Sequence, residues 1–237
     1  MAGDEVQAVV FDLDGVLVDS EELWDEVRRG LAAEAGRPWP AEATRAMQGM
    51  STGEWSAYLT DVVGLPGQPE DMAATVIDRM AARYRSRLPL IPGAVEVVQR
   101  LGSRWSLGLA SSSPRRLIDA VLESAGLASW FRVSVSTEEV AAGKPSPAVY
   151  REVATRLGVD PQRAVAIEDS SNGLRSAAGA GLRVIAVPNA AFPPEEDALA
   201  LAGVVVHSLD EIVPELVEGT RRVAVNGSST GRALPCG

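Results

Sequence analysis

The sequence predicts an α/β fold, in which helices cover a parallel sheet and an all-helical segment is inserted after the first strand. Two observations support this prediction. Short apolar runs alternate with helix-length segments between residues 90 and 217, and such alternation is typical of βαβ units. Residues 18–88, in contrast, hold apolar residues at helical spacing and no run that resembles a strand. We therefore expect one sheet and one helical insertion.

The strands are expected at short apolar runs that are bounded by turn residues. Runs of Val, Ala, Ile and Phe that are apolar on both faces belong to parallel sheets covered by helices. The crossovers between such strands are expected to be right-handed. The runs are residues 6–11, 107–110, 131–135, 164–167, 183–187 and 204–206.

Helices are expected where apolar residues recur at helical spacing. Ser20 or Asp19 is positioned to cap the first helix, and Pro114 begins a later one. The expected helices lie at residues 21–32, 41–47, 52–63, 70–87, 93–101, 114–125, 146–157, 170–179, 195–201 and 209–217.

These elements divide the chain into a core and an insertion. The core comprises residues 1–17 and 88–218, and the helical domain comprises residues 18–87. Residues 219–237 are rich in Gly, Ser, Asn and Arg with little periodicity, and we expect them to form a flexible tail.

The composition excludes several classes of function. The net charge is −10, which is unsuited to binding nucleic acid through its phosphates. No apolar run has the length of a membrane span, and the acidic N-terminus does not resemble a signal peptide, so we expect a cytoplasmic protein. Cys236 and His207 are single residues of their type, which argues against disulfides, thiol catalysis and His-rich zinc sites.

Polar side chains follow four of the predicted strands. The carboxyl ends of parallel strands lie at one edge of the sheet, where ligands bind. Several carboxylates gathered there need a partner charge, and oxygen ligands suit Mg²⁺. A lysine adds a second cation, and a serine adds a hydroxyl. The residues are Asp12, Asp14, Ser111, Lys144, Glu168 and Asp169.

This set of groups suits phosphoryl transfer, which depends mostly on positioning and on stabilising charge. A carboxylate can act as the nucleophile and form an aspartyl-phosphate. A metal ion screens the repulsion between that carboxylate and the phosphate. A second carboxyl group can protonate the leaving alkoxide and later accept a proton from water.

The motifs resemble those of the haloacid dehalogenase (HAD) superfamily. The run DLDGVLVDS at residues 12–20 is similar to its first motif, Ser111 to its second, the lysine of GKPSP at residues 143–147 to its third, and the acidic pair of IEDSSNG at residues 167–173 to its fourth. The resemblance covers residues 6–217 and implies a Rossmann-like core. The helical insertion falls where the family carries its mobile type 1 cap.

The resemblance also implies roles for individual residues. Asp12 is implied as the nucleophile and a Mg²⁺ ligand. Asp14 is implied as the general acid and base, with its main-chain carbonyl on the metal. Ser111 and Ser112 are implied to hold the phosphate, and Lys144 to neutralise the nucleophile and the phosphate. The resemblance further implies metal ligation by Asp169, and by Glu168 directly or through water.

Within the superfamily, the sequence favours a phosphatase. Asp14 disfavours the dehalogenase branch, because a halide needs no protonation. The β-phosphoglucomutase pattern has an Arg after a Gly-x-Ser in the cap, where this chain has Thr52, and a His in the first cap helix, where this chain has Trp24. We expect hydrolysis of a small phosphorylated metabolite. A sugar phosphomutase is the alternative, and a non-catalytic binding protein with this fold is a further one.

Substrate choice is expected to depend on the cap. Thr52 and Trp24 are the first candidates for substrate contact, although Trp and Met at helical spacing more often form a core. We expect no nucleic-acid or membrane partner, and a monomer or weak homodimer. The full set of cap candidates is Glu21, Trp24, Arg28, Met47, Met50, Thr52 and Trp55.

Overall fold

The protein is described from a computed structural model, which covers residues 5–47, 50–189 and 193–223. Most of the tail predicted at residues 219–237 therefore lies outside the described residues. The predicted α/β fold is confirmed: a six-stranded sheet has the order β3-β2-β1-β4-β5-β6, and all its pairings are parallel. The strands are β1 (Ala8–Phe11), β2 (Ser106–Ser111), β3 (Phe131–Ser136), β4 (Ala164–Glu168), β5 (Arg183–Ala186) and β6 (Val204–Val205).

Strand β1 lies at the centre of the sheet and is completely buried. Phe11 is in register with Leu109 of β2 and with Ile167 of β4. Because the three strands are parallel, the residues that follow these positions emerge together at one edge. This register brings Asp12 beside the end of β4 and close to the end of β2.

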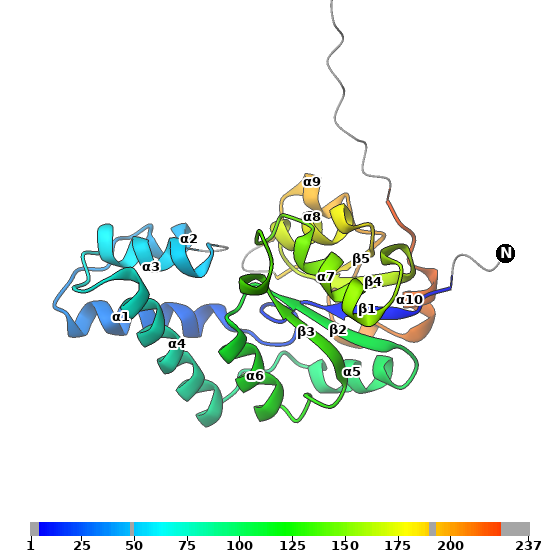
Figure 1. Ribbon diagram of the computed structural model, residues 1–237, viewed down its shortest axis with the longest axis horizontal. Coiled ribbons are helices and arrows are strands. Elements are labelled where there is room, and N and C mark those ends of the chain that lie inside the picture. The colour runs from blue at the N-terminus through cyan, green and yellow to red at the C-terminus, as the bar shows by residue number, and fades with distance from the viewer. Residues whose placement is uncertain (1–4, 48–49, 190–192, 224–237) are drawn as a thin grey trace, which may run out of the picture.

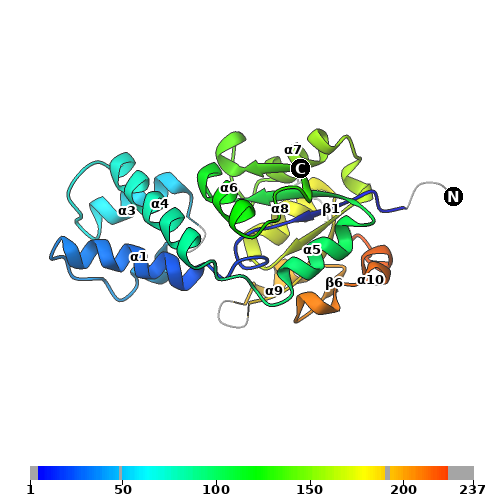
Figure 2. The ribbon, with the colours of Figure 1, turned by 90° about the horizontal axis from the view of Figure 1, so that it is seen from below.

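Helices cover both faces of the sheet. Val9 and Phe11 contribute to one apolar core, and Ala8 and Val10 contribute to the other, as the two-residue period of a strand requires. Figure 1 shows α5 and α6 beneath the sheet and α7, α8 and α9 above it; in Figure 2 α5 and α6 lie in front of the sheet. The core helices are α5 (Ala94–Gly102), α6 (Arg115–Ser124), α7 (Ala148–Leu157), α8 (Ser171–Ala180), α9 (Glu196–Leu199) and α10 (Pro214–Gly219), with short 3-10 helices η1 (Thr137–Glu139), η2 (Pro161–Arg163) and η3 (Leu209–Glu211).

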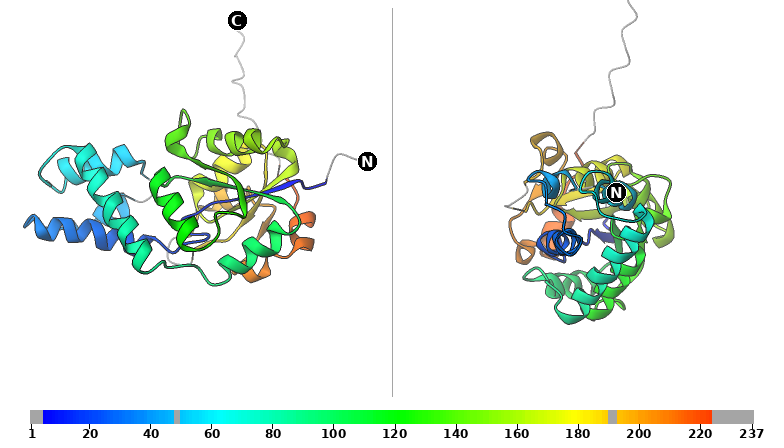
Figure 3. Two further views of the ribbon diagram at one scale, coloured as in Figure 1. Left: turned by 60° about the horizontal axis from the view of Figure 1, so that its bottom comes forward. Right: turned by 90° about the vertical axis from the view of Figure 1, so that its left-hand side faces the viewer.

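In the described part of the chain, four helices between β1 and α5 form the insertion, here called the cap. They are α1 (Glu21–Glu34), α2 (Ala43–Ala46), α3 (Thr52–Asp61) and α4 (Pro69–Ser86). They group at one end of the molecule, beyond the carboxyl ends of the strands (Figure 3). The segments entering and leaving the cap pair with each other, since Asp19 donates to the carbonyl of Pro89 at 2.9 Å. The division into two domains at residues 17/18 and 87/88 stays a prediction.

Two sequence predictions about helices are wrong, one about the continuity of a helix and one about a helix cap. The single helix expected at residues 209–217 is interrupted, because Val213 is extended (ψ 160°) and Pro214 begins a new helix; the residue before a proline is disfavoured in the helical region. Ser20 precedes α1 but makes no capping hydrogen bond. Its hydroxyl donates instead to Asp14. Among the described residues, no helix has both the length and the apolar character needed to cross a bilayer.

Candidate active site

A buried lysine lies between two carboxylates at the carboxyl edge of the sheet. Lys144 Nζ donates to Asp12 Oδ1 at 2.7 Å and to Glu168 Oε1 at 2.6 Å. The side chains of Lys144 and Asp12 are 5% and 8% exposed, and that of Glu168 is completely buried. Burial alone would lower the pKa of Lys144, but the two carboxylates outweigh it and the pKa is raised. Lys144 is therefore a permanent cation in contact with Asp12.

Three carboxylates share this one lysine. Burial, opposed by Lys144 and reinforced by Glu168, raises the pKa of Asp12 to about 7. Burial, with the charges of Glu168 and Asp12, also raises the pKa of Asp169. Burial is the main cause of both shifts, and the excess of acidic groups over cations adds to it, so a further positive charge would stabilise the ionised form of the cluster.

The cluster fits a hard divalent cation. Asp12, Glu168 and Asp169 each offer an oxygen, and these oxygens lie within 4.8 Å of one another. Asp169 Oδ1 is buried and has no hydrogen-bond partner in the described structure, as expected of an oxygen that is reserved for a ligand. An all-oxygen donor set is the one that Mg²⁺ prefers.

Asp14 makes its side-chain hydrogen bonds outside this cluster. The hydroxyl of Ser20 donates to its Oδ1 at 2.6 Å, and the hydroxyl of Ser113 donates to its Oδ2 at 2.7 Å. Its carboxylate is therefore not among the three that could hold a metal, and the predicted contact of its carbonyl with the metal stays a prediction. Ser20 lies at the entrance to the cap, directly before α1, and Ser113 lies in the loop after β2.

The loop after β2 carries the predicted phosphate-binding serines. Ser111 is completely buried, and its Oγ accepts from the backbone N–H of Ser113 at 2.9 Å. Ser112 is exposed. Ser136, at the end of β3, donates through its hydroxyl to the carbonyl of Ser113 at 2.7 Å. These bonds fix the loop at the same edge of the sheet as Asp12, and phosphate binding by Ser111 and Ser112 stays a prediction.

Glu168 is held more firmly than the sequence indicates. Its Oε2 accepts from the backbone of Asp169 at 3.1 Å and from the hydroxyl of Ser170 at 3.2 Å. Its Oε1 accepts from the hydroxyl of Tyr150 at 2.9 Å. Tyr150 is completely buried, and its ring lies 5.2 Å from Lys144 Nζ. Sequence reasoning missed Tyr150, because its spacing within α7 is that of an ordinary core residue.

Two glycines give the carboxylates room. A Cβ at Gly173 would lie 1.8 Å from Glu168 Oε1, and a Cβ at Gly15 would lie 1.9 Å from Asp169 Oδ2. Gly15 also has a φ of +84°, which favours glycine. Gly15 lies in the first motif and Gly173 in the fourth, so glycine at these positions of the motifs was the signal that could have indicated the close approach of the carboxylates.

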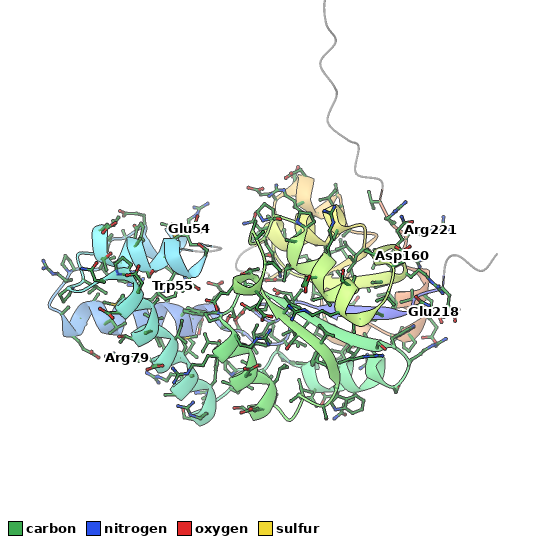
Figure 4. The ribbon with its side chains drawn as sticks, in the orientation of Figure 1. Glu54, Trp55, Arg79, Asp160, Glu218 and Arg221 are labelled. Carbon is green, nitrogen blue, oxygen red and sulfur yellow. The ribbon has the colours of Figure 1, made fainter. Side chains whose placement is uncertain are left out.

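Most of the cap candidates line the interior of the cap. The rings of Trp24 and Trp55 lie 5.8 Å apart, and the guanidinium of Arg28 stacks on them at 4.7 and 5.0 Å. Burial lowers the pKa of Arg28 to about 10. Trp55 and its neighbour Glu54 are labelled in Figure 4. Substrate contact by Trp24 stays a prediction, whereas Thr52 reaches the core, as described below. Met47 is buried, and Glu21 and Met50 are half-buried.

Comparison with known proteins identifies the family to which the chain belongs. A family model described as haloacid dehalogenase-like hydrolase matches residues 6–181. The chain belongs to this family. Hexitol phosphatase B of Escherichia coli (strain K12) is 34% identical over 88% of this chain and 95% of its own. The phosphorylated carbohydrates phosphatase of Thermotoga maritima is 33% identical over 76% of this chain and 84% of its own.

Solved structures of HAD-like proteins share the fold. CbbY from Rhodobacter sphaeroides, solved in complex with phosphate, is 30% identical and superposes with a TM-score of 0.77 over 87% of this chain and 96% of its own. The expectation of an α/β hydrolase of this family is therefore confirmed.

Proposed function

We propose that this HAD-like hydrolase is a Mg²⁺-dependent phosphatase that acts on a small phosphorylated metabolite, such as a sugar phosphate, through an aspartyl-phosphate intermediate. The observation that carries the proposal is the contact of Asp12 with Lys144 beside a three-carboxylate cluster. The similar proteins named hexitol phosphatase B and phosphorylated carbohydrates phosphatase support it. A cytoplasmic, monomeric or weakly dimeric protein is part of the same proposal.

Asp12 is the proposed nucleophile. Its carboxylate oxygen forms a bond to phosphorus as the bond from phosphorus to the ester oxygen breaks. Lys144 lies against the same carboxylate and neutralises part of the charge that gathers there. Mg²⁺, held by Asp12, Asp169 and Glu168, would supply the charge that screens the approach of two anions.

Asp14 is the proposed acid and base. In the first step it donates a proton to the leaving alkoxide, which departs as an alcohol. In the second step it accepts a proton from the water that attacks phosphorus, which frees inorganic phosphate and Asp12. Ser20 and Ser113 each donate to one oxygen of Asp14, so two hydrogen bonds orient this carboxyl group before substrate arrives.

A mutase is less well supported by this geometry. The mutase pattern needs a cation in the cap to grip a second phosphate. Thr52 stands at that position and donates to Glu138, so an acidic group faces the place of the expected arginine. A non-catalytic role does not explain why the buried Lys144 contacts both Asp12 and Glu168.

The proposal is tested by the release of phosphate from an aryl phosphate with and without Mg²⁺. We expect Mg²⁺-dependent release by the wild-type protein and none by Asp12→Asn. Asp71→Asn, which changes an exposed carboxylate in the first turn of α4, is the matched control and should retain activity. Equal release by wild-type and Asp12→Asn protein would refute the proposal.

A second assay separates phosphatase from mutase. With β-glucose 1-phosphate and a bisphosphate activator, a phosphatase releases free phosphate, whereas a mutase forms glucose 6-phosphate. Formation of glucose 6-phosphate faster than free phosphate would reverse the ranking of the two functions.

A further inference from the structure

A carboxylate of the core faces the cap at the edge of the proposed active site. Glu138 lies in η1, which follows β3 directly. The preceding residue, Thr137, places its Oγ1 3.5 Å from the carbonyl of Ser112. A Cβ added at Gly143, the neighbour of Lys144, would lie 3.8 Å from Thr137 Cβ, in ordinary van der Waals contact, so the two residues are adjacent. Glu138 is therefore carried by a segment that contacts both the predicted phosphate-binding loop and the lysine loop.

This segment is firmly anchored. The adjacent residue, Glu139, accepts from Arg115 through Nε at 2.9 Å, from Arg156 at 3.0 Å, and from the backbone of Ser136 at 3.1 Å. Partial burial opposes ionisation, but these hydrogen bonds lower the pKa of Glu139 to about 2. The position of Glu138 is thus set by its neighbour, while its own side chain remains exposed.

Glu138 meets the cap through a neutral hydroxyl. Thr52, the first residue of α3, donates from Oγ1 to Glu138 Oε1 at 3.2 Å. No ion pair involves Glu138 within residues 5–47, 50–189 and 193–223. A hydroxyl group of a bound molecule could take the place of that of Thr52, because both are donors to the same acceptor.

The surrounding charges do not favour a second anion. The positive end of α3 is already occupied by Glu54, whose carboxylate accepts from the backbone and hydroxyl of Ser51 at 2.7 Å. The two arginines that begin α6 are also paired, Arg115 with Glu139 and Arg116 with Asp78. A second phosphate near Thr52 would therefore lie beside the Glu138 carboxylate, and neither of these two arginines is free to compensate the repulsion.

We propose that Thr52 and Glu138 form a subsite for hydroxyl groups of the leaving alcohol, and that Glu138 selects polyhydroxy monophosphates against bisphosphates. This inference rests on the proposed phosphatase function and specifies its substrate class. Glu138 accepts hydrogen bonds from a polyol and repels a second phosphate, so one residue sets both preferences.

The test compares two sugars that differ only in a second phosphate. Hydrolysis of p-nitrophenyl phosphate with Mg²⁺ serves as the reporter, and glucose 6-phosphate and glucose 1,6-bisphosphate are added as competitors. The ratio of their inhibition constants is measured for wild-type, Glu138→Gln and Glu123→Gln proteins. Glu123 is exposed and lies in the last turn of α6, at the end of that helix remote from Ser111, so Glu123→Gln makes the same change in charge away from the site.

We expect the wild-type protein to bind the monophosphate more tightly. Glu138→Gln should reduce this preference by about tenfold, the effect of removing one partly solvated charge contact, and Glu123→Gln should preserve it. Equal ratios in wild-type and Glu138→Gln proteins, or a wild-type preference for the bisphosphate, would overturn the subsite while leaving the phosphatase function intact. Absence of reporter hydrolysis by the wild-type protein would instead overturn the phosphatase function, and the subsite with it.

Discussion

Replacing Tyr150 by Phe removes one hydroxyl and leaves a buried ring in place. That hydroxyl donates to Glu168 Oε1 at 2.9 Å in a completely buried setting. A hydrogen bond to a charged group contributes about 1.5–3 kcal/mol, so we expect the free energy of unfolding to fall by about 2 kcal/mol. In a chain of 237 residues, this corresponds to a decrease of about 4–8 °C in Tm.

Tyr84 provides a matched control. It is also buried, in α4, but its hydroxyl, which lies near that of Ser20, has no partner of normal hydrogen-bond geometry among the described residues. Removing this hydroxyl breaks no hydrogen bond of normal geometry and relieves the cost of burying a polar group. Tyr84→Phe should therefore change the free energy of unfolding by less than about 1 kcal/mol, or raise it.

The assay is thermal unfolding followed by circular dichroism, without metal and then with Mg²⁺. The account predicts that Tyr150→Phe lowers Tm and that Tyr84→Phe does not. If both variants lowered Tm equally, the loss would reflect packing of the rings, and the argument that Tyr150 supports the charge of Glu168 would be refuted.

Three further predictions concern substitutions of glycines, stabilisation by Mg²⁺, and the dependence of stability on Glu139 at low pH. Gly173→Ala places a Cβ 1.8 Å from Glu168 Oε1 and should displace that buried charge. We expect urea unfolding to show a loss of about 3 kcal/mol or more, together with loss of phosphatase activity. In the control Gly30→Ala, where a Cβ meets nothing within 4 Å, stability should instead rise by about 0.5–1 kcal/mol. Mg²⁺ at about one hundred times its Kd should stabilise the protein by about 2.7 kcal/mol in calorimetry, and an equal gain in Asp169→Asn would exclude that residue as a ligand. The pKa of Glu139 is lowered from 4.5 to about 2, so its contribution to folding stability is present above pH 4.5 and is lost as the pH falls towards 2. Over that range the urea midpoint of Glu139→Gln should therefore decline less than that of the wild-type protein. Parallel declines would argue against a stabilising role of the ionised Glu139.

The carboxylate cluster was predictable because it depends on sheet topology alone. Asp12 and Glu168 follow apolar runs, and parallel strands in register bring such residues to one edge. Lys144 was predictable for the same reason, as the residue in the turn that leads from β3 to α7. The meeting of Asp12, Glu168 and Lys144 confirms this reasoning.

Contacts that depend on side-chain direction could not be predicted. Asp14 and Asp12 are two residues apart and were expected in one cluster, yet Asp14 turns to Ser20 and Ser113. Tyr150 contacts Glu168 because of how α7 packs on the sheet, which no periodicity reveals. These contacts are set by tertiary packing, whereas sequence spacing indicates only which residues share a face or an edge.

The cap shows the same limit. Trp24 at helical spacing predicts either a core residue or a substrate contact, and the structure places it against Trp55 and Arg28 inside the cap. Thr52 drew attention because it stands where the β-phosphoglucomutase pattern has an arginine. Its actual partner, Glu138, is 86 positions away in sequence, and no local signal connects the two.

The most direct test of the account is to locate the phosphoryl group during turnover. Asp14→Asn protein, which lacks the proposed base for the second step, would be mixed with an aryl phosphate and Mg²⁺, quenched in acid, digested and mapped by mass spectrometry. The account predicts phosphorylation of Asp12 in a near-stoichiometric burst. A phosphoryl group on any other residue, or release of aryl alcohol with no covalent intermediate, would contradict it.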